Sequence, residues 1–288
     1  MSASPKQSLR MAVVGGGTMG VGIAYVFAVA GWEVFVVEPD AGRADSLRRT
    51  LASAAAAGVQ RGKLNAEQAQ HAAGVPRLGA VADLPLGLDL VVETVPERLA
   101  LKCEVLAGIA ARQPRVIGTN TSALSIDELA QSVPDAGAFL GMHFFNPVWS
   151  LALVELIHGA KTRPEVLDLA RQWVGSIGKT PITVRNVPGF ATSRLDLIAS
   201  LEAMRMLQDG VASADDIDRA AVLAYRHPVG PLRLSDIVGL DVRLDIARAL
   251  SQSLGERYAP PRILEELVAQ GHLGQKSGRG FFDWIAKA

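Results

Sequence analysis

The sequence contains a single cysteine, Cys103, so no disulfide can form within one chain. One free thiol suits a protein of the reducing cytosol and argues against a disulfide-stapled secreted domain. The surrounding residues, LALKCEVLAGI, have the pattern of an amphipathic helix. This setting favours a buried thiol over a nucleophilic one.

The chain also lacks a net charge and a long apolar run. Lys and Arg together number 29, as do Asp and Glu, so the overall charge draws the protein neither to nucleic acid nor to an acidic membrane. No apolar run is as long as a membrane-spanning helix, and the polar N-terminus, MSASPKQSLR, is unlike a signal peptide. We therefore expect a cytoplasmic protein with neither nucleic acid nor membrane as a partner.

A glycine-rich turn lies between an apolar strand pattern at residues 11–14 and an apolar helical pattern. Its three spaced glycines fit G-x-G-x-x-G in the strand–turn–helix context of a dinucleotide site. They allow a tight turn, a close approach of the pyrophosphate and close packing of helix on strand, while the helix N-terminus offers free N–H groups. The candidate cofactor contacts are Gly15, Gly17, Thr18, Met19 and Gly20.

The next strand pattern, residues 33–37, ends on Glu38. A carboxylate at about this distance after the glycines accepts hydrogen bonds from both ribose hydroxyls and repels a 2′-phosphate. The pattern therefore predicts NAD as the cofactor, in preference to NADP. The alternative is a surface glutamate at a strand end, and Arg43 nearby is suited to hold a 2′-phosphate.

Two further strand patterns end in polar residues. Residues 88–92 end at Glu93, and residues 115–119 are followed by Asn120 and Ser122. Ligands of open α/β sheets bind outside the carboxyl ends of the strands. We therefore expect these three polar residues at the functional edge of the sheet.

A histidine and a glutamate stand out in the next two strand patterns. His143 lies near the end of residues 139–145, and Glu155 lies in the middle of the apolar residues 151–157. A buried carboxylate without a partner is costly, so Glu155 must be paired. His143 is the nearest candidate if the two strands are neighbours; the alternative is a histidine satisfied within the core.

Two segments have the capping-box pattern of a helix start, Ser125–Glu128 and Thr162–Glu165. The second predicts a helix that runs to about Ile177. Between the second and third strand patterns, the polar residues 58–79 carry Arg61 and Lys63. These basic residues indicate either a solvated helical hairpin or a contact for substrate phosphates.

The pattern changes at residues 186–189. Before this point strands alternate with helices, which predicts an α/β Rossmann-like dinucleotide-binding domain with a mostly parallel sheet. After it only helical periods follow, which predicts an all-α domain. The chain is long enough for two domains, so we predict an NAD-binding domain at residues 1–186 and an α-helical domain at residues 187–288.

Eight motifs together carry a resemblance to a known family. They are GGGTMGVGIA (15–24), ETVPERLALK (93–102), NTSALSI (120–126), HFFNPV (143–148), LVELI (153–157), VPGF (187–190), HPVGPLRLSDIVGLD (227–241) and GQKSGRGFFDW (274–284). In this order they cover essentially the whole chain. The sequence resembles the 3-hydroxyacyl-CoA dehydrogenases, most closely the bacterial 3-hydroxybutyryl-CoA dehydrogenases.

The resemblance implies oxidation of a 3-hydroxyacyl-CoA with NAD, without a metal, in a homodimer joined through the helical domain. It implies that His143 is the catalytic base, that Glu155 orients it, and that Ser122 holds the substrate oxygen. The nicotinamide and substrate cleft would be lined by Glu93, Lys102 and Asn146, with Asn120 at the same edge. Asn146 would also help to polarise the developing oxygen.

Two departures from the family pattern affect the substrate side. Family members commonly carry Asn in the first turns of the helix after the PGF motif, where this chain has Ser193. The common HFFNPVP is here HFFNPVW, which places Trp149 beside the catalytic loop. A shorter polar side chain and a bulky ring at these positions can change recognition of the acyl group.

Three functions are compatible with these patterns. The first is a 3-hydroxyacyl-CoA dehydrogenase, and the second is a sister enzyme for another 3-hydroxy compound, such as a carrier-protein thioester, a sugar acid or carnitine. The third is a non-enzymatic NAD-binding protein on the same fold. Arg61 and Lys63 favour a phosphate-bearing substrate, and the presence of His143 with Glu155 argues against the third function.

Overall fold

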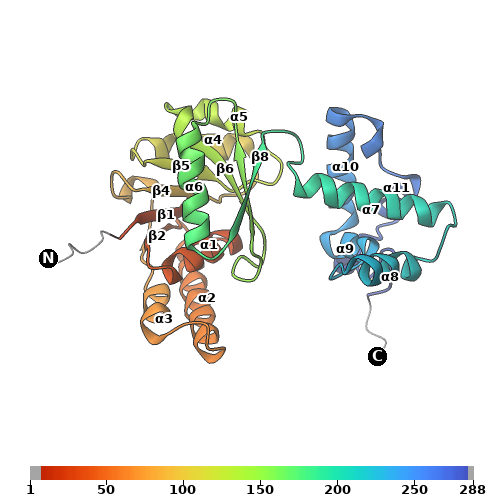
Figure 1. Cartoon of the computed structure of the whole chain (residues 1–288), viewed down its shortest axis with the longest axis horizontal. Helices are drawn as coiled ribbons and strands as arrows, with labels where there is room; N and C mark the ends of the chain where they lie inside the picture. Colours follow the sequence, from red (N-terminus) through yellow and green to blue (C-terminus); the bar gives the residue numbers. More distant parts are fainter. Residues whose placement is uncertain (1–7, 285–288) are drawn as a thin grey trace. The chain divides into compact units, whose positions relative to one another are not determined.

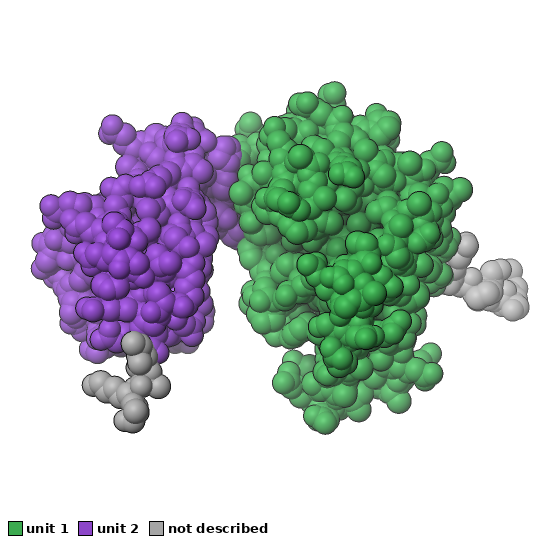
Figure 2. Space-filling model, turned by 180° about the vertical axis from the view of Figure 1, so that it is seen from behind, with its two compact units in different colours: residues 1–187 green, residues 188–288 purple. Residues whose placement is uncertain are grey.

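The structure, a computed structural model, describes residues 8–284 (Figure 1). Most of the N-terminal segment that we contrasted with signal peptides lies outside the described residues. The chain divides into two compact units, residues 1–187 and 188–288, which Figure 2 shows in separate colours. Within the described part of the chain, no helix has the length and apolar character needed to cross a membrane.

The first unit is built on one sheet of eight strands in the order β3-β2-β1-β4-β5-β6-β7-β8. The strands are β1 (Arg10–Val14), β2 (Glu33–Val37), β3 (Arg77–Leu78), β4 (Leu90–Glu93), β5 (Val116–Thr119), β6 (Phe139–Phe144), β7 (Leu153–His158) and β8 (Thr180–Arg185). Only β6 and β7 pair antiparallel; every other neighbouring pair in this sheet is parallel. The predicted mostly parallel α/β sheet is confirmed.

Helices connect these strands and cover the sheet. They are α1 (Thr18–Val29), α2 (Ala41–Gln60), α3 (Ala66–Ala73), α4 (Leu99–Ala110), α5 (Ile126–Leu129) and α6 (Pro164–Ser176). The chain leaves β1 and β4 in opposite directions along the sheet, so right-handed crossovers place α1 and α4 on opposite faces. Because both faces are covered, the central strands are continuous apolar runs.

Aromatic rings fill the core on the face covered by α1 and α6. The rings of Phe27 and Trp32 lie 5.1 Å apart, and those of Trp32 and Trp173 lie 5.6 Å apart, each pair edge to face. Phe27 is fully buried, and burying a side chain of this kind contributes about 1.5–3 kcal/mol. This packing holds the C-terminal end of α1, the helix that follows the glycine turn, in the core.

The polar segment after the second strand forms a helical hairpin. Figure 1 shows α2 and α3 side by side, extending away from the sheet. Arg61 is the C-terminal cap of α2, and Asn65 starts α3 with a capping box in which its side chain and that of Gln68 each accept a backbone N–H. The sequence patterns left two alternatives for this segment, a solvated helical hairpin or a contact for substrate phosphates. The hairpin is present, and its basic residues Arg61 and Lys63 line a pocket.

Of the two predicted capping boxes, the first is present as an N-cap and the second is wrong. Ser125 does cap α5, because its Oγ accepts from the Glu128 N–H at 3.3 Å. Thr162, however, donates its hydroxyl to the Phe139 carbonyl oxygen, 2.7 Å away. Helix α6 therefore begins at Pro164 without a side-chain cap; proline suits a first helical position because its φ is already helical.

The second unit is all α-helical, as predicted. Its helices are α7 (Thr192–Gln208), α8 (Ala214–Tyr225), α9 (Pro231–Val238), α10 (Leu240–Leu254) and α11 (Arg262–Ala269). The C-terminal aromatic tail is attached to this unit by Asp236, whose carboxylate accepts from the Phe281 and Phe282 N–H groups and from the Trp284 indole. The side chain of Asp236 thus replaces regular secondary structure in holding the tail.

Candidate active site

The glycine turn after β1 has the geometry that a pyrophosphate requires. Gly15 has a φ of +113°, which residues with a side chain rarely adopt. A Cβ on Gly20 would lie 1.8 Å from the Gly15 carbonyl oxygen, so the start of α1 and the turn could not approach this closely with any other residue. A Cβ on Gly17 would meet nothing within 4 Å. The backbone before Thr18, the first residue of α1, therefore faces open space.

Glu38 lies against this turn. Its Oε2 accepts from the Gly16 N–H and its Oε1 from the Asp40 N–H, both at 3.0 Å. The residue is only 3% exposed, so its carboxylate is held next to the glycines and not at the outer surface. The side chain of Arg43 is 64% exposed and lies 3.5 Å from the Asp40 carboxylate.

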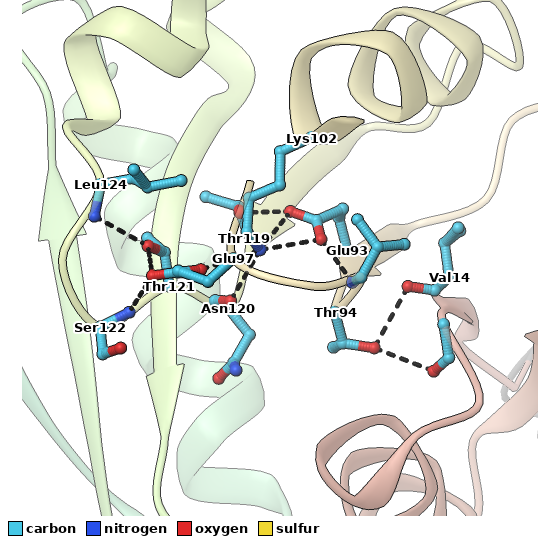
Figure 3. Close-up of polar contacts among 12 residues, drawn as sticks. Val14, Glu93, Thr94, Glu97, Lys102, Thr119, Asn120, Thr121, Ser122 and Leu124 are labelled. Atoms are coloured by element: carbon cyan, nitrogen blue, oxygen red, sulfur yellow. Dashed lines mark hydrogen bonds and ion pairs between the residues drawn. The ribbon is translucent and has the colours of Figure 1, made fainter. Parts of the chain in front are cut away.

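The turn lies at the point where the strand order reverses. Strands β1 and β4 are neighbours, and the chain continues from them toward opposite edges of the sheet. Ligands of doubly wound sheets bind outside the carboxyl ends of such a pair. Thr94, directly after β4, donates its hydroxyl to the Val14 and Gly15 carbonyl oxygens at 3.1 and 2.9 Å, which joins the two strand ends (Figure 3).

A buried ion pair lies behind this edge. Lys102 Nζ is 2.9 and 3.0 Å from the two carboxylate oxygens of Glu93, and also donates to the Asn120 carbonyl oxygen at 3.0 Å (Figure 3). The Thr119 hydroxyl and the Val95 N–H donate to Glu93 as well. Burial raises the pKa of the Glu93 carboxyl group, and the Lys102 charge and these hydrogen bonds oppose that rise.

The expectation that Glu93 and Lys102 line the cofactor cleft needs correction. Both side chains have 0% exposure, and their polar atoms bond to each other and to neighbouring backbone. A ligand outside the sheet edge therefore meets the loops that this pair holds. The sequence motif located the pair; only the tertiary packing showed that it faces inward.

Asn120 and Ser122 lie at the edge where they were expected. The Asn120 side-chain oxygen accepts from the Phe144 N–H at 2.9 Å, so the end of β5 is tied to the residue after His143. Ser122 is exposed in the turn after β5, and Asn146 is exposed in the loop after β6. Asn120 and Ser122 follow β5, and Asn146 follows the neighbouring strand β6.

His143 and Glu155 form a direct pair. They are opposite each other in the antiparallel register of β6 and β7, so both side chains are on one face of the sheet. His143 Nδ1 lies 2.8 Å from Glu155 Oε2, and the Glu155 side chain has 0% exposure. Because a carboxylate only accepts, Nδ1 carries the proton and Nε2 is the basic nitrogen of the neutral ring.

A pocket of about 740 Å³ opens between α1, α2 and the loop after β6. Its lining includes three basic side chains of α2 and the residues just after it, Arg49, Arg61 and Lys63. It also includes two aromatic rings, Tyr25 of α1 and Trp149 of the loop after β6. The two rings meet edge to face, 6.1 Å apart. The structure therefore brings together Arg61, Lys63 and Trp149, which the sequence named separately.

Lys179 forms the floor of the loop beside this pocket, and the sequence patterns did not identify it. Its Nζ donates to the Val148 and Leu151 carbonyl oxygens, which flank Trp149 on either side. Burial lowers the pKa of the Lys179 ammonium group. Ser193, the other substrate candidate, lies half-buried in the first turn of α7, in the second unit.

These features define a class of protein: a dinucleotide-binding Rossmann-type domain with a His–Glu pair at the ligand edge, followed by a helical domain. Family profiles for the 3-hydroxyacyl-CoA dehydrogenase NAD binding domain and C-terminal domain match residues 10–187 and 189–284. The chain belongs to the 3-hydroxyacyl-CoA dehydrogenase family, which confirms the resemblance of its motifs. The match to an NAD binding domain supports the predicted use of NAD.

Individual relatives agree over nearly the full chain. The 3-hydroxybutyryl-CoA dehydrogenase of Clostridioides difficile is 36% identical over 96% of this chain and 99% of its own length. The crystal structure of (S)-3-hydroxybutyryl-CoA dehydrogenase from Ralstonia eutropha is 36% identical, with a TM-score of 0.91 over 96% of this chain and 99% of that one. A diketoreductase structure is 25% identical, with a TM-score of 0.81 over 96% and 99%.

Proposed function

We propose that the protein oxidises a short-chain 3-hydroxyacyl-CoA, of the 3-hydroxybutyryl type, to the 3-oxoacyl-CoA with NAD, or catalyses the reverse reduction. The observation that carries this proposal is the 2.8 Å contact of His143 with the buried Glu155, in the same sheet that carries the dinucleotide turn. Two relatives similar over almost their whole length are named 3-hydroxybutyryl-CoA dehydrogenases.

The residues have distinct parts in the proposed reaction. Bound NAD would supply the hydride acceptor for the hydrogen on C3. His143 Nε2 takes the hydroxyl proton as the carbonyl forms, and Glu155 fixes the tautomer and stabilises the imidazolium. The Ser122 hydroxyl and the Asn146 amide donate to the reacting oxygen, on which charge develops.

The cofactor in this proposal is NAD and not NADP. The open space at Gly17 fits a pyrophosphate, and the Glu38 carboxylate next to the turn is suited to the ribose hydroxyls. A 2′-phosphate would meet that carboxylate in a site where it is only 3% exposed, and repulsion between two anions at short range is strong. Arg43 is already paired with Asp40 and largely exposed.

The phosphate-bearing end of the substrate is assigned to the basic pocket. Arg49, Arg61 and Lys63 place three positive charges around it, and Trp149 adds a ring face. Coenzyme A carries phosphates, which the basic side chains can bind, and an adenine ring, which the Trp149 ring can contact. An alternative is a 3-hydroxy substrate without CoA. The similarity to a diketoreductase supports this alternative, because the same fold can carry different substrate specificities.

The proposed assembly is a homodimer joined through the helical unit. Seven of the twelve exposed large apolar side chains among the described residues belong to residues 188–288, although that unit is the shorter one. A small domain has limited capacity to bury its own apolar surface. A second copy is the partner that the family resemblance implies.

A panel of 3-hydroxyacyl thioesters of different chain length tests this function. Each thioester is offered with NAD or NADP, and reduced cofactor is measured by absorbance. We expect turnover of short-chain CoA thioesters with NAD, and competitive inhibition by free CoA because CoA alone retains the phosphates that the basic pocket would bind.

Different results point to different errors in the proposal. Equal rates with NADP contradict the role of Glu38. Turnover that free CoA does not inhibit assigns the protein to a substrate without CoA. Binding of NAD with no turnover of any thioester contradicts the enzymatic function.

A further inference from the structure

Glu97, in the loop between β4 and α4, holds the turn that carries Ser122. Its Oε1 accepts from the Thr121 hydroxyl at 2.5 Å, the Ser122 N–H at 3.0 Å and the Ala123 N–H at 3.2 Å (Figure 3). Three donors from three consecutive residues thus converge on one oxygen atom. The turn follows β5, whereas the carboxylate follows the neighbouring strand β4.

The other oxygen of Glu97 is attached to the buried ion pair. Glu97 Oε2 lies 3.4 Å from Lys102 Nζ, which also binds Glu93 and the Asn120 carbonyl oxygen. The Lys102 side chain has 0% exposure, whereas the Glu97 side chain is 37% exposed. Glu97 therefore connects a rigid, buried charge to an exposed turn.

The turn needs this connection because it has few other constraints. Within it, the Thr121 hydroxyl accepts from the Leu124 N–H at 3.0 Å and, at 3.4 Å, from the Ala123 N–H. No strand or helix includes residues 120–125. Without the carboxylate, the Ser122 N–H would lose its acceptor and the Ala123 N–H would keep only the 3.4 Å contact with the Thr121 hydroxyl. The orientation of the Ser122 side chain would then no longer be set.

We propose that Glu97 is a positioning residue that presets the Ser122 hydroxyl for the substrate oxygen, with Lys102 as its anchor. This inference rests on the proposed role of Ser122 in the reaction. Ser122 is exposed, while its backbone N–H is hydrogen-bonded to Glu97. A residue that contacts a ligand with a preset side chain needs both an accessible side chain and a fixed backbone. Hydrogen bonds to a charged acceptor are about twice as strong as neutral ones, so a carboxylate suits this task better than an amide.

A double-mutant cycle of Glu97→Gln with Ser122→Ala tests the proposal. The amide has nearly the same shape but loses the charge and turns an NH₂ group toward Lys102 or toward the turn. We expect Glu97→Gln to lower kcat by about 10- to 100-fold, since misplacement of a positioned group by about 1 Å costs up to this factor.

The cycle separates positioning from general stabilisation. If Glu97 acts through Ser122, then adding Glu97→Gln to Ser122→Ala lowers kcat no further. If Glu97 only stabilises the fold, the two effects multiply and the inference is overturned. A Ser122→Ala enzyme with normal kcat would instead contradict the proposed role of Ser122, and the inference with it.

Two further variants complete the experiment. Asp135→Asn is the matched control, because Asp135 also accepts from a turn N–H, that of Gly137 at 3.0 Å, and pairs with a basic side chain, Arg163; its kcat should be unchanged. Thr121→Val removes one of the three donors without changing the shape and should give a smaller loss of kcat. If Glu97→Gln protein does not fold, Thr121→Val replaces it in the double-mutant cycle with Ser122→Ala. A normal kcat in folded Thr121→Val protein would overturn the inference.

Discussion

At the scale of single residues, the unusual feature is a carboxylate with no exposed surface inside an apolar strand. Glu155 has lost its hydration, and the 2.8 Å contact with His143 Nδ1 returns one strong hydrogen bond. A positive imidazolium beside this carboxylate is stabilised far more strongly than it would be in water, because the solvent screens the attraction between the two charges only weakly. The pair is therefore suited to take up a proton from a substrate and hold it.

His143→Gln should lower kcat by at least about 100-fold, since general base catalysis contributes about 10²- to 10⁴-fold. Glu155→Gln should lower kcat nearly as much, because an amide no longer holds the imidazole in its tautomer. The double variant should be far from additive, as expected of residues that act as one unit.

Three measurements on the same three variants check this prediction: the melting temperature, the NAD affinity and kcat. NAD affinity should be close to that of the unmodified protein, because neither residue belongs to the glycine turn. The competing explanation is a His–Glu pair that only stabilises the core, in which case the variants melt earlier but keep their turnover per folded molecule. A near-normal kcat in folded His143→Gln protein would rule out the mechanism.

At the scale of secondary structure elements, the Glu93–Lys102 pair joins β4, α4 and the end of β5. Fully buried ion pairs stabilise a fold only when every polar atom is satisfied. Lys102 Nζ binds Glu93, Glu97 and the Asn120 carbonyl oxygen, while Thr119 donates to Glu93. The elements that carry the site are thus held in one arrangement by charge and not by packing alone.

Lys102→Met should lower the free energy of unfolding by about 3–5 kcal/mol, because it leaves the Glu93 carboxylate buried without its counter-charge. Urea unfolding measures this loss. The matched control is Lys276→Met, which breaks a pair with Asp241 whose side chains are 46% and 38% exposed, and should cost about 0–1 kcal/mol. Equal losses in the two variants would contradict the role of the buried pair.

The loss in Lys102→Met should also depend on pH. Burial already raises the pKa of Glu93, and removal of the lysine charge raises this pKa further. A carboxyl group whose pKa is higher in the folded state binds more protons when the protein is folded. The free energy of unfolding therefore falls as pH rises from the pKa of the unfolded protein toward the raised pKa of the folded protein. The variant should therefore be closer to the unmodified protein at pH 5 than at pH 8.

At the scale of the whole molecule, the helical unit exposes several large apolar side chains. Leu195, Leu223 and Tyr225 are 70%, 72% and 77% exposed. Single exposed apolar residues are common on protein surfaces, so their number in a short unit is more informative than any one of them. Association with a second copy would remove such surface from water at about 25 cal/mol per Å².

The protein should scatter light at micromolar concentration with a mass near twice the 30.4 kDa of one chain. Leu223→Glu combined with Tyr225→Glu should shift it toward the monomer, because two buried, unpaired charges oppose association. Leu86→Glu changes a residue of the first unit that is 60% exposed and should leave the mass unchanged. A monomeric unmodified protein would contradict the proposed dimer.

The amino-acid sequence by itself determined the elements and the edge on which the ligand site lies. The predicted strand at residues 33–37 has the same bounds in the structure. The glycine turn was equally plain, because positive φ and close approach are local demands that only one residue type meets. Continuous apolar runs and helical periods likewise indicate which residues of a segment are buried, because this information is contained in the order of residues within the segment itself.

The tertiary structure alone decided which polar groups meet. The sequence named His143 as the partner of Glu155 only if their strands were neighbours, and sheet order supplied that condition. It could not show that Lys102 faces inward or that Glu97 holds the turn after β5, because such contacts join segments from different strands. Thr162 illustrates the same limit: its local pattern is that of a helix cap, but its hydroxyl bonds to the Phe139 carbonyl oxygen. A polar group bonds to the partner that folding brings within reach, and sequence spacing does not encode that distance.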